Sequence, residues 1–250
     1  MSGGGARVDR QPLVRSATMT SSSNSKPHAP PLLQRQSSAP GLRKGGSSSL
    51  SRTSHSHPIT VSPVSKTGSG RLGLCYCPGK NLVREGIKWE RDLDIDLRDM
   101  KERHRVDVVV CLLSPAELRS LGVRRDYCES VVKSGMELIM HPIIEMAAPD
   151  DIGSARELVE RVVGELAKGK RVVMHCRGGM GRAGMMAACV LYRVGEAQGH
   201  KAAIEMVRKR RGKGAVESRA QEAFVAKYQQ LGVKVGWEGE GPAGDQQEPP

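Results

Sequence analysis

The chain has 250 residues, a formal net charge of +12 and an apolar share of only 38%. This low apolar share, and seven aromatic residues that all follow position 75, exclude a uniform globule of this length. The longest strictly apolar run, residues 185–192, is far shorter than the roughly 20 residues of a membrane span. We therefore expect no transmembrane segment and no secretory leader, and the six sparse cysteines favour a reducing compartment, cytoplasmic, nuclear or both.

The two ends of the chain differ in composition from its middle. Residues 1–68 hold 16 serines, seven prolines, no aromatic residue and a net charge of +8, which predicts a disordered basic tail. Within it, Ser38 follows an arginine by three residues and Ser62 precedes a proline, and both patterns suit kinases. Residues 234–250 are mostly Gly, Glu, Gln and Pro and predict a second disordered tail. One folded domain is left, over residues 69–233.

Alternating strand and helix patterns fill this domain. In chain order they predict a strand at 71–76, a helix at 91–104, a strand at 106–113, a helix capped by Ser114, a helix at 125–134, a strand at 136–143, a loop at 144–151, a helix capped by Asp151, a strand at 170–175, and helices at 182–197, 200–211 and 215–231. Apolar strands that alternate with helices predict an α/β fold whose central, mainly parallel sheet is flanked by helices.

The segment with the strongest chemical signal is His-Cys-Arg-Gly-Gly-Met-Gly-Arg, residues 175–182, between a predicted strand and a predicted helix. Its glycines permit a tight turn whose backbone N–H groups point inward, and the positive end of the helix adds to this anion site. The same field favours the thiolate of Cys176, which is the nucleophilic form. Arg182 can present a planar fork to two phosphoryl oxygens. The segment therefore suits phosphoryl transfer to sulfur.

This segment resembles the signature of the cysteine-dependent protein tyrosine and dual-specificity phosphatases. Further segments resemble the cyclin-dependent kinase inhibitor 3 family, also called kinase-associated phosphatases, namely Leu72 to Gly79, His141-Pro142-Ile143, Pro149-Asp150 and Gly214 to Gln221. The resemblance implies a protein tyrosine phosphatase-like fold without metal or other cofactor. It also implies that Cys176 forms a phosphocysteine and that Arg182 binds phosphate. The implied pocket lining is Arg177, Gly178, Gly179, Met180 and Gly181.

A general acid must protonate the oxygen that leaves. The family has an aspartate for this role on a loop before the cysteine, and alignment on His141-Pro142-Ile143 puts Glu145 at that position. Glutamate can perform the chemistry, although its extra methylene shifts the carboxyl group. Asp150 is the alternative acid, and both Asp150 and Asp151 have helix capping as their more common role.

Several other residues carry predictions from the resemblance. Ala183 stands where the family usually has Ser or Thr, so we expect slower hydrolysis of the intermediate. Gln221 matches a glutamine that can position water, although exposure on the helix surface is the more common role. His175 is expected to support the loop through hydrogen bonds. For two further groups a structural role is the simpler interpretation. Cys75 and Cys77 are expected to be buried side chains, rather than metal ligands or thiols that regulate Cys176 by forming a disulfide. The basic run Arg208 to Arg211 is expected to be a solvated helix face, rather than a contact for an acidic substrate or membrane lipid.

Three functions fit these residues. We favour a phosphoprotein phosphatase that acts on phosphotyrosine, with dual specificity as an extension and a cyclin-dependent kinase as the partner that the resemblance implies. A phosphoinositide phosphatase is the first alternative, because Arg177 and the basic surface suit a polyanionic head group. A catalytically weak phosphate- or kinase-binding module is the second, because Glu145 and Ala183 depart from the family pattern. The positive charge of the folded domain includes Arg177 and Arg182, which are expected to bind one phosphate group. We therefore expect no nucleic-acid partner.

Overall fold

A computed structural model describes residues 50–65, 70–84, 86–232 and 236. The chain divides into two units, residues 1–46 and 47–250, and every described residue belongs to the second. The predictions for Ser38 and for most of the 234–250 tail therefore lie outside the described residues. Among the described residues, no helix has the length and apolar character that a membrane crossing requires.

The described residues form two sheets, one of order β2-β3-β8-β6-β7 and one of order β1-β5-β4. The strands are β1 (Leu50–Thr53), β2 (Ser62–Pro63), β3 (Arg71–Tyr76), β4 (Asn81–Arg84), β5 (Ile87–Glu90), β6 (Val108–Cys111), β7 (Glu137–Met140) and β8 (Arg171–Cys176). The helices are α1 (Leu93–Glu102), α2 (Pro115–Ser120), α3 (Tyr127–Lys133), α4 (Ile152–Ala167), α5 (Gly181–Arg193), α6 (His200–Arg211) and α7 (Arg219–Gln230).

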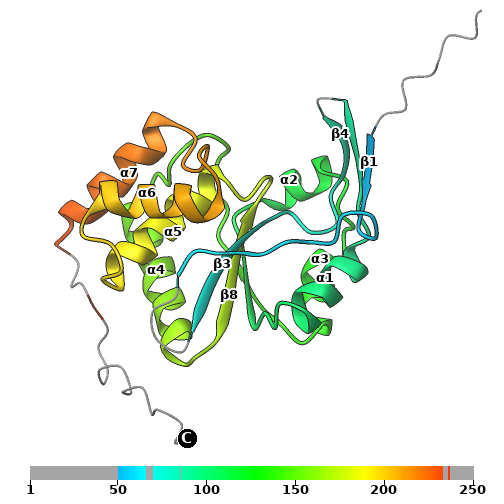
Figure 1. Ribbon diagram of the computed structural model, residues 1–250, viewed down its shortest axis with the longest axis horizontal. Helices are drawn as coiled ribbons and strands as arrows, with labels where there is room; N and C mark the ends of the chain where they lie inside the picture. Colours follow the sequence, from blue (N-terminus) through cyan, green and yellow to red (C-terminus); the bar gives the residue numbers. More distant parts are fainter. Residues whose placement is uncertain (1–49, 66–69, 85, 233–235, 237–250) are drawn as a thin grey trace, which may run out of the picture. The chain divides into compact units, whose positions relative to one another are not determined.

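The five-stranded sheet is the centre of the fold. Strands β3, β8, β6 and β7 run parallel, and β2 adds an antiparallel strand at one edge. Helices α4, α5, α6 and α7 lie to one side of β3 and β8, and α1 and α3 lie to the other (Figure 1). Because both faces are covered, β6 is buried along its whole length, as its run of valines predicted. The predicted α/β fold with a mainly parallel sheet is confirmed.

Helix α5 is the central helix on its side of the sheet. It contacts β8, α4, α6 and α7, and 12 of its 13 residues are buried. The apolar run at 185–192 lies within this helix, and its side chains are apolar because nearly the whole helix is buried in the core. The chain therefore places the start of α5, and with it Arg182, in a rigid and fully packed position.

The predicted boundary at residue 68 was wrong for residues 50–65. This segment forms β1 and β2, with Ser62 opposite Leu74 of β3. Its side chains Ile59 and Val64 are 1% and 0% exposed and belong to the main hydrophobic core. The average composition of the Ser- and Pro-rich segment hides these few apolar side chains. Sheet pairing then supplies the backbone hydrogen bonds that a short polar strand needs.

Candidate active site

Strand β8 places Cys176 where the carboxyl ends of the parallel strands meet. Cys176 is the last residue of β8, is paired in register with Tyr76 at the end of β3, and is 3% exposed. The backbone N–H of Gly179 donates a hydrogen bond to its Sγ atom at 3.3 Å. Helix α5 begins at Gly181, so the positive end of a buried helix faces the same loop. The sulfur thus lies among donors that favour an anion.

Two glycines of this loop are required by close approach of their neighbours. Gly179 has a φ of +67°, and a Cβ atom there would lie 2.0 Å from the carbonyl oxygen of Cys75. A Cβ atom at Gly181 would lie 2.2 Å from Oε2 of Glu217. The loop is therefore packed against β3 on one side and against the segment before α7 on the other. Met180, the residue before α5, strengthens this contact because its carbonyl accepts a hydrogen bond from Val216 N at 3.2 Å.

Arg182 is held in place by two contacts of one nitrogen. The side chain is 3% exposed, and Nη1 donates to Oε1 of Glu117 at 2.6 Å and to the carbonyl of Ile143 at 2.7 Å. Among the described residues, Nε and Nη2 of Arg182 have no hydrogen-bond partner. The fixed Nη1 therefore leaves the Nε–Nη2 edge available as a pair of donors.

Glu117 is a site residue that the sequence did not reveal. It completes a capping box at the start of α2 with Ser114, whose backbone N–H donates to Oε2 at 3.1 Å. Burial alone would raise the pKa of Glu117, but hydrogen bonds from Ser114 and Arg182 hold that pKa below its usual value. Its carboxylate therefore stays ionised and neutralises Arg182. The cap was predictable, but the ion pair links residues 65 apart in the chain.

Arg211, at the end of α6, supports the loop from behind. Its Nε donates to the carbonyl of Gly179 at 2.9 Å, and its Nη2 donates to the carbonyl of Gly178 at 3.0 Å. Its Nη1 donates to Oγ of Ser62 in β2 at 2.9 Å. One guanidinium thus fixes two carbonyls of the loop whose Gly179 N–H donates to the sulfur.

The prediction of a solvated basic face on α6 was therefore wrong for three of its four residues. Arg208 donates to the carbonyls of Ala215 and Val216, and Arg210 donates to the carbonyl of Val64. Only Lys209 of this run is exposed. The arginines instead join the end of α6 to the segment before α7, to the segment around β2 and to the cysteine loop.

His175 lies behind the sulfur on the opposite face of β8. It is fully buried, and its Nε2 lies 2.6 Å from the hydroxyl of Tyr127, the first residue of α3. Burial lowers the pKa of His175 to about 4, so the imidazole is neutral at physiological pH. His175 therefore joins α3 to the end of β8.

The loop between β7 and α4 carries the predicted acid. Oε1 of Glu145 lies 2.8 Å from Nη1 of Arg177, so the structure brings these two predicted site residues together. The neighbouring residue Met146 has a φ of +62°. Its carbonyl accepts a hydrogen bond from Oγ of Ser218 at the start of α7, at 2.8 Å. This side-chain contact ties the loop to the helix that also packs beside Gly181.

The alternative acid Asp150 lies differently. Its side chain is exposed, and among the described residues it makes no hydrogen bond or ion pair. The next residue, Asp151, caps α4 by accepting from the N–H groups of Gly153 and Ser154, as its position predicted. The structure therefore ties Glu145, and not Asp150, to the cysteine loop.

Gln221 is fully buried, so the expectation that it lies on the helix surface was wrong. Its Oε1 accepts from the backbone N–H of Glu217 at 2.9 Å, and its Nε2 donates to the carbonyl of Ala147 at 3.4 Å. A Cβ atom at Gly181 would lie 3.0 Å from its amide. Gln221 therefore links three segments: the loop between β7 and α4 that carries Glu145, called the acid loop below, the segment before α7, and the start of α5.

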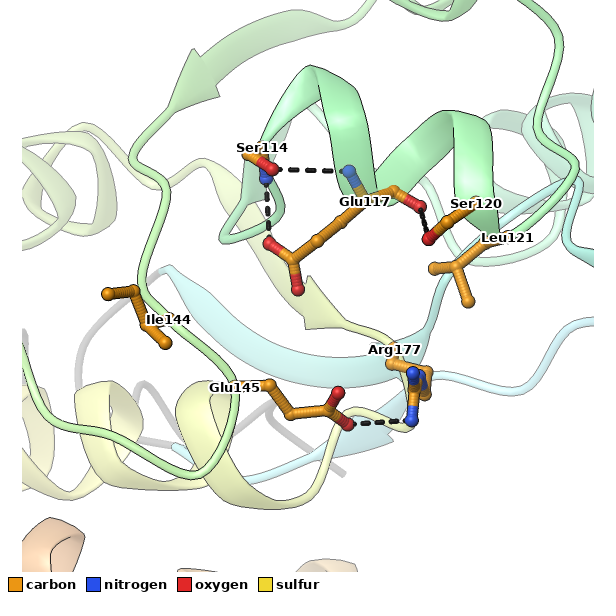
Figure 2. Close-up of a pocket in the computed structure, with 7 residues that line it drawn as sticks. All are labelled: Ser114, Glu117, Ser120, Leu121, Ile144, Glu145 and Arg177. Carbon is orange, nitrogen blue, oxygen red and sulfur yellow. Dashed lines mark hydrogen bonds and ion pairs between the residues drawn. The ribbon is translucent and has the colours of Figure 1, made fainter. Parts of the chain in front are cut away.

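An open pocket of about 450 Å³ lies between α2 and the acid loop (Figure 2). In Figure 2, Glu145 reaches from the acid loop toward Arg177, and Glu117 projects from α2 on the other side of the pocket. Its lining combines polar groups with the apolar side chains of Leu121 and Ile144, the latter 68% exposed. The full set is Ser114, Glu117, Ser120, Leu121, Ile144, Glu145 and Arg177.

Cys75 and Cys77 are buried free thiols, as the simpler interpretation had it. Burial raises the pKa of Cys75 to about 12 and also raises the pKa of Cys77. Both thiols are therefore protonated at physiological pH. They belong to the apolar core beneath the loop.

Comparison with known proteins identifies relatives of this chain. A family model for cyclin-dependent kinase inhibitor 3 matches residues 50–204. The cyclin-dependent kinase inhibitor 3 of Rattus norvegicus is 29% identical over 174 residues, covering 68% of this chain and 79% of the relative. That of Homo sapiens is 27% identical over 157 residues, covering 63% of this chain and 71% of the relative.

Solved structures give the same result. A kinase associated phosphatase with serine at its catalytic cysteine has a TM-score of 0.62 and 25% identity, covering 70% of this chain and 96% of its own. Tk-PTP in its active form has a TM-score of 0.51 and 24% identity, covering 68% and 97%, and supports the fold alone. Since the family model spans more than half of the chain, this protein belongs to the cyclin-dependent kinase inhibitor 3 family and is a cysteine-dependent protein phosphatase.

Proposed function

We propose that Cys176 is the nucleophile of this phosphatase, that Arg182 binds the phosphoryl group and that Glu145 is the general acid. One observation carries the proposal. One short loop carries both groups. The sulfur of Cys176 accepts a hydrogen bond from a backbone N–H, and Nη1 of Arg182 is anchored by Glu117 and Ile143. Both groups face the start of a buried helix, where negative charge that develops in the transition state is stabilised.

The chemistry has two displacements at phosphorus. In the first, the thiolate of Cys176 forms an S–P bond while the P–O bond of the ester breaks, and Glu145 gives its proton to the oxygen that leaves. In the second, Glu145 takes a proton from water, the water oxygen bonds to phosphorus, and the S–P bond breaks to return the thiolate. The backbone N–H groups from Arg177 to Arg182 stabilise the charge on the phosphoryl oxygens in both steps.

The ion pair between Glu145 and Arg177 gives the acid a defined starting position. A phosphate dianion at the loop competes for Arg177 and so releases the carboxyl group of Glu145. The carboxyl must then carry a proton to act in the first displacement. Ala183 supplies no hydroxyl near the sulfur, and we expect the second displacement to be the slower one.

The substrate follows from the relatives. Their names, cyclin-dependent kinase inhibitor 3 and kinase associated phosphatase, support a phosphorylated cyclin-dependent kinase as substrate and partner. The open pocket with its apolar wall suits a protein side chain, and its openness to solvent is compatible with phosphothreonine as well as phosphotyrosine.

The proposal is tested with a generic aryl phosphate and rapid acid quench. The wild-type protein should hydrolyse the ester and show an acid-stable phosphoenzyme, whereas Cys176→Ser should do neither. Cys128→Ser is the matched control, because Cys128 is an exposed free cysteine on α3. Equal hydrolysis by wild type and Cys176→Ser would refute the role of the sulfur.

The general acid is tested by the pH dependence of kcat. Glu145→Gln should abolish the descending limb, which reports loss of the proton donor as pH rises, and Asp150→Asn should retain it. Loss of that limb in Asp150→Asn alone would assign the acid to Asp150 instead.

A further inference from the structure

Three cations gather on two aromatic rings beside the cysteine loop. The Nζ atom of Lys80 lies 3.5 Å from the ring centroid of Trp89 and 4.7 Å from that of Tyr76. The guanidinium carbon of Arg52 lies 5.3 Å from the Trp89 ring, and that of Arg91 lies 4.9 Å from the Tyr76 ring. The two rings are 5.4 Å apart, so one small aromatic cluster holds all three positive charges.

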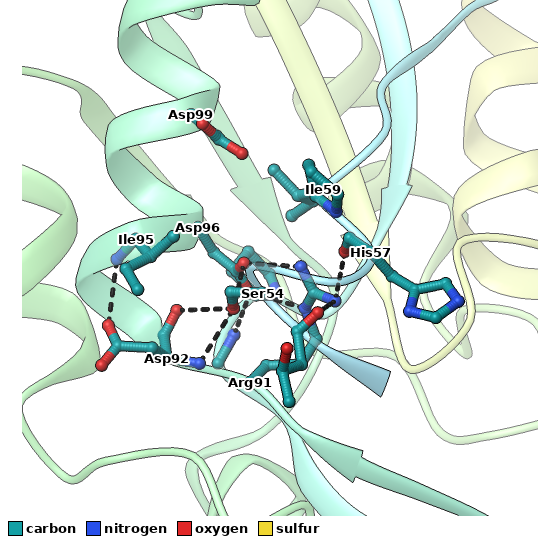
Figure 3. Close-up of polar contacts among 12 residues, drawn as sticks. Ser54, His57, Ile59, Arg91, Asp92, Ile95, Asp96 and Asp99 are labelled. Atoms are coloured by element: carbon teal, nitrogen blue, oxygen red, sulfur yellow. Dashed lines mark hydrogen bonds and ion pairs between the residues drawn. The ribbon is translucent and has the colours of Figure 1, made fainter. Parts of the chain in front are cut away.

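Only one of these cations is neutralised. Both carboxylate oxygens of Asp96 accept from the guanidinium of Arg91, at 2.6 and 2.8 Å (Figure 3). The remaining capacity of Asp96 is taken by Oγ of Ser54 and by the backbone N–H of Gly79. Both oxygens of Asp96 are thus engaged by these donors, and among the described residues Asp96 forms no ion pair with Lys80.

Lys80 and Arg52 have no such partner. Among the described residues, neither side chain forms an ion pair or a hydrogen bond. Lys80 is only 6% exposed, which is rare for a lysine without a counter-ion. Burial, with the charges of Arg91 and Arg52, lowers the pKa of Lys80 to about 8, so the position strains the charged form. An anion bound here would relieve both the burial cost and the repulsion.

This cluster is next to the reacting centre. Tyr76 is the register partner of Cys176, and the next residue, Cys77, donates its backbone N–H to the carbonyl of Arg177 at 3.2 Å. The nearby sulfur of Cys176 raises the pKa of Lys80 slightly, against the larger lowering by burial.

The turn that carries Lys80 also touches the pocket wall. The backbone N–H of Asn81 donates to the carbonyl of Leu121 at 2.7 Å, and Leu121 lines the pocket. The backbone of the turn that carries Lys80 is therefore fixed to a residue that forms part of the pocket wall.

We propose that Lys80 and Arg52 bind a second anionic group of a phosphoprotein substrate, a carboxylate or a second phosphate close to the phosphate that is hydrolysed. The proposal rests on the proposed phosphatase function of Cys176. It makes the Lys80 cluster a specificity site, which selects phosphorylated segments with acidic or doubly phosphorylated surroundings. Lys80 and Arg52, which have no ion-pair partner among the described residues, are then paired with the anionic group of the bound substrate.

The test uses phosphopeptides of one sequence in three forms, with neutral flanking residues, with acidic flanking residues and with a second phosphate. The readout is the ratio of kcat/KM for each anionic peptide to that for the neutral one. Wild type should prefer the anionic peptides, and Lys80→Met should lower the ratio roughly tenfold, as for loss of one charged hydrogen bond. Arg52→Met should lower it as well, and Lys80→Arg should keep most of it.

Lys88→Met is the matched control, because Lys88 lies in the same small sheet but is ion-paired with Glu90 at 2.6 Å. Its ratio should equal that of wild type. Thermal unfolding and hydrolysis of aryl phosphate show that each variant is folded and active. The two anionic peptides distinguish a carboxylate from a phosphate as the bound group.

The outcomes separate the two proposals. Wild type that hydrolyses aryl phosphate but shows no preference for anionic peptides overturns the specificity site and leaves the phosphatase function in place. An unchanged ratio in both Lys80→Met and Arg52→Met also overturns it. A soluble phosphoinositide is assayed beside the peptides. If Lys80→Met lowers kcat/KM for the phosphoinositide but leaves the peptide ratios unchanged, the phosphoprotein assignment is overturned. Wild type without aryl phosphatase activity contradicts the proposed function itself.

Discussion

Replacing Asp96 by asparagine should destabilise the folded domain strongly. Asp96 and Arg91 are both 0% exposed as side chains, and Asp96 accepts four hydrogen bonds, two of them from Arg91. Asparagine keeps the shape but removes the charge, and its amide N–H groups then face the donors of Arg91. A buried cation without its partner costs about 3–5 kcal/mol.

This magnitude converts to a lower melting temperature. A domain of this size loses about 2–4 °C for each kcal/mol, so the expected decrease in Tm is about 6–20 °C. Urea unfolding followed by circular dichroism measures the free energy of unfolding directly, and an unchanged m-value shows that compactness is retained.

The matched control is Asp99→Asn on the same helix. Asp99 pairs with Arg103, whose side chain is 56% exposed, at 3.1 Å, and such a pair contributes about 0–1 kcal/mol. The double variant Arg91→Leu with Asp96→Leu should cost less than the sum of the two single changes, because no buried charge remains. If Asp96→Asn cost no more than Asp99→Asn, or if the two changes were additive, the buried ion pair would not be what stabilises this corner of the fold.

Two further predictions concern the support of the cysteine loop. Glu117→Gln breaks the ion pair that holds Nη1 of Arg182 in position, so kcat/KM for aryl phosphate should fall about 10- to 100-fold, with weaker inhibition by inorganic phosphate because the guanidinium is misplaced. Glu117→Asp should restore part of the loss, and wild-type phosphate inhibition in Glu117→Gln would contradict this role. Arg211→Met should release the carbonyls of Gly178 and Gly179 and lower kcat about tenfold, whereas the exposed neighbour Lys209→Met should have no effect. Equal kcat values in these two variants would show that the loop holds its shape without Arg211.

The main sheet and its helices are largely predictable from sequence, because their patterns are local. Strand β6 lies within the predicted run 106–113, and α1 within the predicted helix 91–104. The caps at Ser114 and Asp151 follow from residues within three positions of each other. The small sheet β1-β5-β4 and the edge strand β2 were missed, since their short polar strands carry no clear alternation. The strands β4 and β5 form a local hairpin, whereas β1 pairs with β5 across more than 30 residues.

The chemistry predicted for the cysteine loop can be read from the sequence, because the strand end, Cys176, the glycines and Arg182 are contiguous in the chain. Tertiary structure alone decided what holds and surrounds that loop. Glu117 and Arg211 reach it from 65 and 32 residues away, and the unpaired charge of Lys80 depends on which carboxylate Arg91 occupies. A charged side chain looks the same in sequence whether it is solvated or buried, since only packing decides which partners lie within hydrogen-bond distance.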